Sequence, residues 1–111
     1  MPEIVVVGSL KAKPGREDDT REALGGLVGP THAEDGCILY ALHQGAEDPT
    51  RFAFVERWES AEKLQAHLGS DHIGVVLQRA EELLAEPPDI VAYEALGQGE
   101  ESKGSLAAHA A

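Results

Sequence analysis

Two histidines and the only tryptophan of the chain lie close together in the sequence, at His67, His72 and Trp58. An imidazole side chain titrates near neutral pH and can take the proton of a phenol. An indole ring can stack on a planar aromatic molecule or direct an electron toward dioxygen. These three residues are therefore candidate catalytic residues, with His67 or His72 as the base. Each has a structural alternative, which is core packing for the indole and a capping or structural hydrogen bond for the imidazoles.

The apolar segment that ends at Trp58 predicts a pocket beside these groups. Period-two alternation along a strand places Phe54, Glu56 and Trp58 on one face. Glu56 is then a half-buried carboxylate, which acts as a general base if desolvation raises its pKa, or else forms a structural hydrogen bond or ion pair. Tyr40, from the preceding strand, lines the pocket with its hydroxyl or simply fills the core. The predicted substrate pocket comprises Tyr40, Phe54 and Glu56.

The two histidines do not indicate a metal site. On one continuous helix, residues five positions apart point roughly 140° away from each other, so the rings of His67 and His72 should diverge. Gly69 interrupts that helix, and no cysteine or carboxylate lies at a recognised ligand spacing. Cys37, the single cysteine, has no visible activating neighbour and can form no internal disulfide. We therefore expect neither a metal nor another cofactor.

Hydrophobic periodicity predicts the elements that must position these residues. Strands are expected at 4–10, 37–44, 51–59 and 90–96, and helices at 16–28, at 61–68 after a Ser60 cap, and at 73–84. This order is that of a ferredoxin-like split βαβ arrangement, an α+β fold with a four-stranded antiparallel sheet and helices on one face. Residues 1–96 form this single domain, and the tail 97–111, rich in Gly, Ser, Glu and Ala, is expected to be disordered.

Two local predictions accompany this scheme. Gly29 and Pro30 are expected to break or kink the first helix. Alternation in the second strand is expected to place Ile38, Tyr40 and Leu42 together on one face.

The apolar pattern of two strands predicts that the chain pairs with a second copy of itself. Residues 4–7 and 52–55 are apolar on both faces of their strands, whereas helices cover only one face of such a sheet. The other face then needs a second cover, which this small chain does not supply. We expect a homodimer in which two chains pack sheet against sheet.

Charge and composition exclude several classes of partner. The net charge is −11, so the basic footprint of a nucleic-acid-binding protein is missing, and an anionic membrane surface would repel the chain. The N-terminus lacks the basic region of a signal peptide, and no segment approaches the ~20 apolar residues of a membrane span. We therefore expect a cytoplasmic protein whose acidity favours small-molecule or protein partners.

With these segments laid out, the chain resembles the antibiotic biosynthesis monooxygenase family of small dimeric ferredoxin-like proteins. The matching segments are 34–40, 48–52, 54–60 and 66–72, within a resemblance that covers about residues 3–96. Some members oxygenate polycyclic phenols or quinols without metal or flavin, some cleave haem, and others act on small signalling metabolites. Trp58 matches the Trp that ends a strand in the family. Haem-degrading members carry Asn, Trp and His where this chain has Gly8, His67 and Leu77, so haem degradation is disfavoured.

The resemblance implies a cofactor-independent monooxygenase that oxidises an electron-rich aromatic, such as a phenol, quinol or polyketide-like substrate, with O2. Its pocket would lie between the sheet and the helices, walled by aliphatic side chains together with Trp58 and Tyr40. The alternative is a non-enzymatic dimer that binds a small hydrophobic ligand or assists a pathway enzyme. A pocket lined by apolar residues serves either function.

Overall fold

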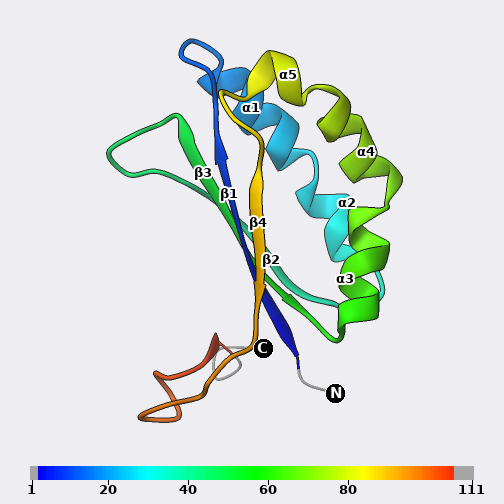
Figure 1. Ribbon diagram of the computed structural model, residues 1–111, viewed down its shortest axis with the longest axis vertical. Coiled ribbons are helices and arrows are strands. Elements are labelled where there is room, and N and C mark those ends of the chain that lie inside the picture. The colour runs from blue at the N-terminus through cyan, green and yellow to red at the C-terminus, as the bar shows by residue number, and fades with distance from the viewer. Residues whose placement is uncertain (1–2, 107–111) are drawn as a thin grey trace.

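A four-stranded antiparallel sheet forms the centre of the computed structural model, which describes residues 3–106. The strands are β1 (Ile4–Lys11), β2 (Cys37–Gln44), β3 (Arg51–Trp58) and β4 (Asp89–Tyr93), in the order β2-β3-β1-β4. The helices lie together on one face of this sheet, as Figure 1 shows. The structure thus confirms the predicted ferredoxin-like α+β fold.

The helical layer follows the order predicted from the sequence. Its described helices are α1 (Glu17–Gly25), α2 (Val28–His32), α3 (Ala61–Leu68), α4 (Asp71–Gln78) and α5 (Ala80–Leu83). Helix α1 begins with three acidic residues, which suit the positive end of the helix dipole. Ser60 caps α3 as predicted, because its Oγ accepts a hydrogen bond from the backbone N–H of Lys63 at 3.3 Å.

The helix breaks differ from the prediction in two places. The break expected at Gly29 and Pro30 lies earlier, at Gly26 and Leu27, and α2 runs through both residues. Pro30 is tolerated there because it lies in the first turn, where a backbone N–H has no partner within the helix. The single helix expected over 73–84 is divided at Arg79, which separates α4 from α5.

The hydrophobic core lies between the helices and the facing side of the sheet. Its largest residues are aromatic, and Trp58 is completely buried. Tyr40 and Leu42 face this core, opposite Glu56 and Phe54 respectively. A β-bulge between Cys37 and Leu39 leaves Ile38 40% exposed and puts Cys37 opposite Trp58. The prediction that Ile38 shares the face of Tyr40 is therefore wrong, because the bulge shifts the alternation by one residue.

The other face of the sheet is also apolar. Its central pair is Val7 and Val55, which lie opposite each other, and Val91 pairs with Val7 from the other side. Tyr93 on β4 is 51% exposed on the same face. No helix in residues 3–106 covers it (Figure 1). This surface, centred on Val7 and Val55, is named here the open sheet face.

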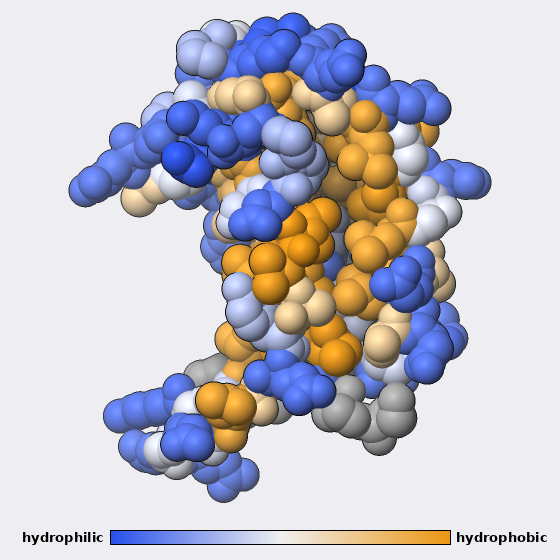
Figure 2. Space-filling model, viewed as in Figure 1, coloured by the Kyte–Doolittle hydropathy of each residue, from blue (hydrophilic) through white to orange (hydrophobic). Residues whose placement is uncertain are grey.

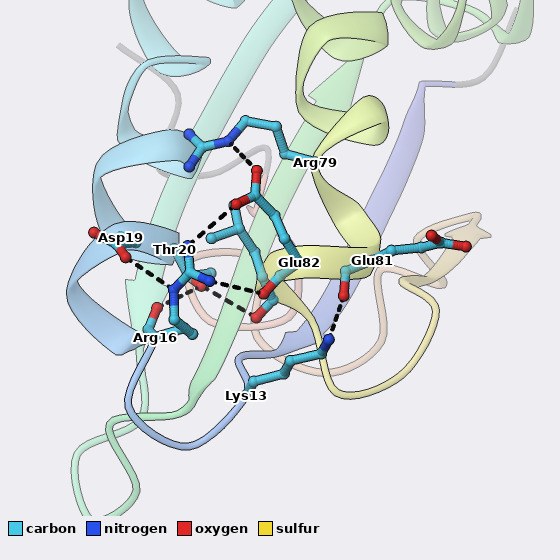
Figure 3. Close-up of polar contacts among 8 residues, drawn as sticks. Lys13, Arg16, Asp19, Thr20, Arg79, Glu81 and Glu82 are labelled. Atoms are coloured by element: carbon cyan, nitrogen blue, oxygen red, sulfur yellow. Dashed lines mark hydrogen bonds and ion pairs between the residues drawn. The ribbon is translucent and has the colours of Figure 1, made fainter.

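An ion-pair network joins α5 to α1 at one end of the helical layer (Figure 3). Arg16 contacts Asp19 at 2.9 Å and Glu82 at 3.2 Å, and Arg79 contacts Glu82 at 2.9 Å. Exposed ion pairs contribute little singly, but one carboxylate shared by two guanidinium groups restricts both helices. The junction between α4 and α5 is therefore tied to α1.

The segment after β4 turns away from the end of the sheet (Figure 1). Strand β4 ends at Tyr93, short of the predicted Leu96, and residues 97–106 form turns that are largely exposed. Residues 107–111 of the predicted tail lie outside the described residues, and disorder of this tail stays a prediction. No helix in the described part of the chain is long and apolar enough to span a bilayer.

Candidate active site

Strands β2 and β3 place four of the predicted site residues side by side. Alternation along β3 directs Phe54, Glu56 and Trp58 toward the helices, and Tyr40 on β2 lies opposite Glu56. The rings of Tyr40 and Phe54 stack with their centroids 4.6 Å apart. These neighbours form the floor of the candidate site.

Glu56 is a carboxyl group buried in this apolar floor. Its Oε1 accepts a hydrogen bond from the Trp58 indole Nε1 at 2.9 Å. Burial raises the pKa of Glu56, while the indole N–H and the nearby His67 oppose that shift. Burial also raises the pKa of the Tyr40 phenol, so this hydroxyl stays protonated at neutral pH and can donate a hydrogen bond.

Helix α3 brings His67 down onto the same aromatic residues. The imidazole is 2% exposed, and its centroid lies 4.6 Å from that of Trp58 and 5.2 Å from that of Tyr40. Trp58 therefore packs directly against the candidate base.

Glu34, which precedes β2, holds both histidines. Its Oε2 lies 2.7 Å from Nδ1 of His67 and 2.7 Å from Nε2 of His72. The prediction that the two rings diverge is wrong, because the chain leaves α3 at Gly69 and starts α4 in a new direction. Ser70, between the helices, donates a hydrogen bond to the His67 carbonyl at 2.6 Å. We call Glu34, His67 and His72 the Glu-His-His cluster.

Sequence reasoning did not single out Glu34 as a candidate site residue. The segment Glu34–Gly36 has the composition of a turn, so the sequence gives no indication that the Glu34 carboxylate contacts a histidine. Glu34 is separated from His67 by 33 positions, so no local spacing connects them. No carboxylate lies at a recognised ligand spacing from the histidines in the sequence, yet the fold brings Glu34 to both of them.

A small cavity lies between the sheet and α4, and His67 forms part of its wall. The polar residues in that wall include Tyr40, Glu56 and His67, and Phe54 contributes an aromatic face. The remaining wall is mainly aliphatic, from α1, α4, α5 and the β4 side. The cavity volume is about 60 Å³, room for roughly two water molecules at ~30 Å³ each.

The structure therefore divides the predicted site residues into two groups. Tyr40, Phe54, Glu56 and His67 line this cavity. Trp58 lies behind His67 and does not line it. His72 instead borders a separate surface hollow between α1 and α4, together with Asp19 and Glu22 among others.

The outer wall of the cavity is its least buried part. Leu77 on α4 is 53% exposed and Ile90 on β4 is 49% exposed, although both line the cavity. Helix α4 contributes no buried residue. Figure 2 shows apolar side chains on both sides of the groove between β4 and the helices. A guest larger than water can enter only where these side chains separate.

A model described as antibiotic biosynthesis monooxygenase matches residues 3–87. The chain belongs to the antibiotic biosynthesis monooxygenase family. Among its relatives, "Putative monooxygenase Rv0793" of Mycobacterium tuberculosis is 32% identical over 84 residues, or 76% of this chain and 82% of that protein. "Putative monooxygenase YcnE" of Bacillus subtilis is 26% identical over 91 residues, or 82% of this chain and 96% of that protein. Membership and these relatives support a monooxygenase-like function.

Solved structures of similar proteins share the fold of this family member. PA3566 from Pseudomonas aeruginosa superposes with a TM-score of 0.82 at 28% identity, covering 86% of this chain and 96% of that one. Rv0793 gives a TM-score of 0.80 at 28% identity, covering 88% and 99%. The chain spans 61% of the length of "Uncharacterized protein sll1783" from Synechocystis, to which it is 28% identical over 90 residues.

Proposed function

We propose that this protein is a cofactor-independent monooxygenase that oxidises an electron-rich aromatic, a phenol or quinol, with O2. The observation that carries the proposal is the orientation of His67. Its Nδ1 contacts the Glu34 carboxylate, and its Nε2 has no hydrogen-bond partner among residues 3–106, although the ring lines an apolar cavity. A carboxylate that accepts Nδ1–H fixes the tautomer in which Nε2 can take a proton.

The first step is transfer of the substrate hydroxyl proton to Nε2 of His67. The Tyr40 hydroxyl can donate a hydrogen bond to the resulting phenolate, because burial keeps it protonated. A substrate that displaces water from the mainly aliphatic remainder of the wall would strengthen this stabilisation of the anion. The site is thus suited to forming a phenolate at neutral pH.

The second step is the reaction of this anion with dioxygen. The phenolate gives one electron to O2, and the phenoxyl radical and superoxide combine at a ring carbon to form a peroxide. Cleavage of the O–O bond with loss of the C–H proton leaves a quinone carbonyl, and the departing oxygen leaves as water after it takes up that proton and the one held by His67. One oxygen atom enters the product and the other leaves as water, so electrons and atoms balance without another reductant.

Substrate binding requires the cavity to enlarge. Small-molecule pockets generally measure about 300–1,000 Å³, several times the volume present here. Outward movement of α4 provides the room, since Leu77 is already half-exposed and no side chain of this helix is fully buried, although Ile73 and Val76 pack against the core. The ion-pair network at Arg79 would hold the far end of α4 during this movement.

Haem degradation is disfavoured. Gly8, His67 and Leu77 all line the cavity, at the positions where haem-degrading members carry their functional residues. A leucine side chain offers no atom that can bind iron. A haem titration without a Soret shift agrees with this exclusion.

We also propose that the protein is a homodimer formed through the open sheet face. The support is the row Val55, Val7 and Val91, which lie side by side on a face that no helix of the described chain covers. Such a surface is typical of an interface between copies.

Oxygen uptake tests the proposed reaction. Purified protein is supplied with a panel of quinols, naphthols and dihydroanthracene-type compounds, and O2 consumption is followed. His67→Gln should lower the rate by about 10²–10⁴-fold, the usual contribution of a general base. His43→Gln is the control, because His43 is exposed and lies outside the cavity. No uptake with any compound, combined with ligand-induced thermal stabilisation, would instead establish the non-enzymatic binding protein.

A further inference from the structure

We propose that the Glu-His-His cluster binds a divalent transition-metal ion, and that the bound ion switches off the base. One oxygen and two ring nitrogens from Glu34, His67 and His72 lie within 4.8 Å of one another. Two imidazoles and one carboxylate form a recurrent ligand set for Zn2+ and for non-haem Fe2+. The second half of this proposal, inhibition, rests on the function proposed above.

The three ligands come from three separate segments of the fold. Glu34 lies between α2 and β2, His67 in the last turn of α3, and His72 in the first turn of α4. Both nitrogens approach the same carboxylate oxygen at 2.7 Å. Ligands about 2.1 Å from an ion are separated from one another by roughly 3.0–3.4 Å. The carboxylate oxygen must therefore move away from both nitrogens by about half an ångström, and the two nitrogens, which lie within 4.8 Å of each other, must approach by up to roughly 1.4 Å.

The surface near His72 offers a route for a cation. The His72 side chain is 23% exposed and borders the hollow between α1 and α4. Asp19 and Glu22 line that hollow, and its one guanidinium, from Arg79, is paired with Glu82. The net charge of −11 further raises the local concentration of cations.

The Glu56 carboxylate shares the cavity with the far side of His67. A metal-bound imidazole commonly donates its other N–H to a carboxylate or carbonyl nearby. Glu56 would be that acceptor once an ion is bound, since Nε2 of His67 has no hydrogen-bond partner among residues 3–106 in the ion-free protein. An ion on Nδ1 places the remaining proton on Nε2, and Nε2 then cannot accept the substrate proton. Metal binding and base function therefore compete for one ring.

Cobalt absorption tests binding without any assay of activity. Co2+ is added to chelator-treated wild-type protein, and its visible d–d bands are recorded together with the melting temperature. We expect the intense visible bands that are typical of Co2+ with a low coordination number. Binding should saturate at one ion per chain, and the melting temperature should rise. Glu34→Gln and His72→Ala should each weaken binding at least about tenfold. The matched controls, Glu47→Gln and His43→Ala, change exposed residues outside the cluster and should bind as the wild type does.

Two results would overturn the site. One is the absence of any spectral change with Co2+ at about millimolar concentration, and the other is unchanged affinity in a Glu34→Gln/His72→Ala double variant. Glu34→Gln retains the size of the side chain, so loss of binding in a variant with unaltered circular dichroism is not a folding defect.

Zinc inhibition separates this proposal from the proposed function. If metal-free wild-type protein consumes oxygen, and the rate falls as Zn2+ saturates the cluster, both the oxygenase and the metal switch are supported. Cobalt binding without oxygen uptake under any condition removes the oxygenase and leaves the site. Uptake with no Co2+ or Zn2+ binding removes the site and leaves the oxygenase. Uptake that rises with Zn2+ overturns the switch.

Discussion

Glu56 accepts the Trp58 indole N–H inside an apolar floor, and burial raises the pKa of its carboxyl above 4.5. The folded state therefore holds the proton of Glu56 more tightly than the unfolded state does. In the unfolded chain the pKa of Glu56 is near 4.5, and in the folded protein it is higher. As the pH rises from the lower of these two values to the higher, the contribution of Glu56 to the free energy of unfolding falls. Glu56 lowers the stability of the fold at neutral and basic pH.

Glu56→Gln should raise the melting temperature at about pH 8 but not at about pH 4, because it removes the buried charge and keeps an oxygen for the indole N–H. Thermal circular dichroism at both pH values checks this prediction. Glu56→Leu is the comparison, since it leaves the indole N–H without an acceptor at a cost of about 1–3 kcal/mol. An identical difference between Glu56→Gln and wild type at both pH values would contradict the argument.

Glu34 should behave as a positioning residue for the base. Glu34→Gln can still contact one ring but cannot accept both N–H groups on one charged oxygen, so kcat for oxygen uptake should fall about 10–100-fold. KM should change little because Glu34 does not line the cavity. Glu34→Asp should recover part of the rate, whereas a full rate in Glu34→Gln would show that the carboxylate does not orient His67.

The neighbours on β3 could be predicted from the sequence, and the partner of the histidines could not. Alternation along a strand is a local rule, so Phe54 and Glu56 are correctly placed on the cavity side. The contact of Glu34 with His67 depends instead on how a turn before β2 meets the end of α3. Such a contact follows from tertiary packing, which no spacing in one sequence encodes.

At the scale of elements, the turn that carries Glu34 depends on Gly36. This residue has φ +88°, and a Cβ there would lie 2.6 Å from Cβ of Lys63 on α3. Both the left-handed conformation and this close approach require glycine. Gly36 thus allows α3 to pack against the segment that supplies the carboxylate.

Gly36→Ala should lower the free energy of unfolding by at least about 1–2 kcal/mol, the cost of a left-handed alanine. Gly25→Ala is the matched control, because Gly25 ends α1 with no atom within 4 Å of the added Cβ. It should be neutral or stabilise by up to about 1 kcal/mol. Urea unfolding of both variants measures the difference, and equal stabilities would refute the role assigned to Gly36.

The strands and the order of the elements could be predicted because periodicity marks them strongly. The direction of α4 could not, since Gly69 signals an interruption without specifying where the chain goes next. The extended backbone of Ser70, with φ −71° and ψ 157°, sets that direction and turns His72 back toward Glu34. A break in a helix thus brought together two rings that a continuous helix would have separated.

At the scale of the whole molecule, the open sheet face should hold two copies together. Val7→Glu places a charge at the centre of this face, between Val55 and Val91, and should convert the proposed dimer to a monomer. Light scattering after size exclusion measures the mass. Ala46→Glu, an equal change in the exposed loop between β2 and β3, should leave the mass unaltered. A wild-type protein that is monomeric at micromolar concentration would rule out the dimer.

The sharing of one carboxylate oxygen by two imidazoles has a consequence for divergence within the family. Replacing either ring alone leaves Glu34 with one donor, and replacing Glu34 leaves two facing rings without a common acceptor. Positions 34, 67 and 72 should therefore covary, so that homologues which lose one member of the trio change the others as well. An alignment in which positions 34, 67 and 72 vary independently of one another would contradict this prediction.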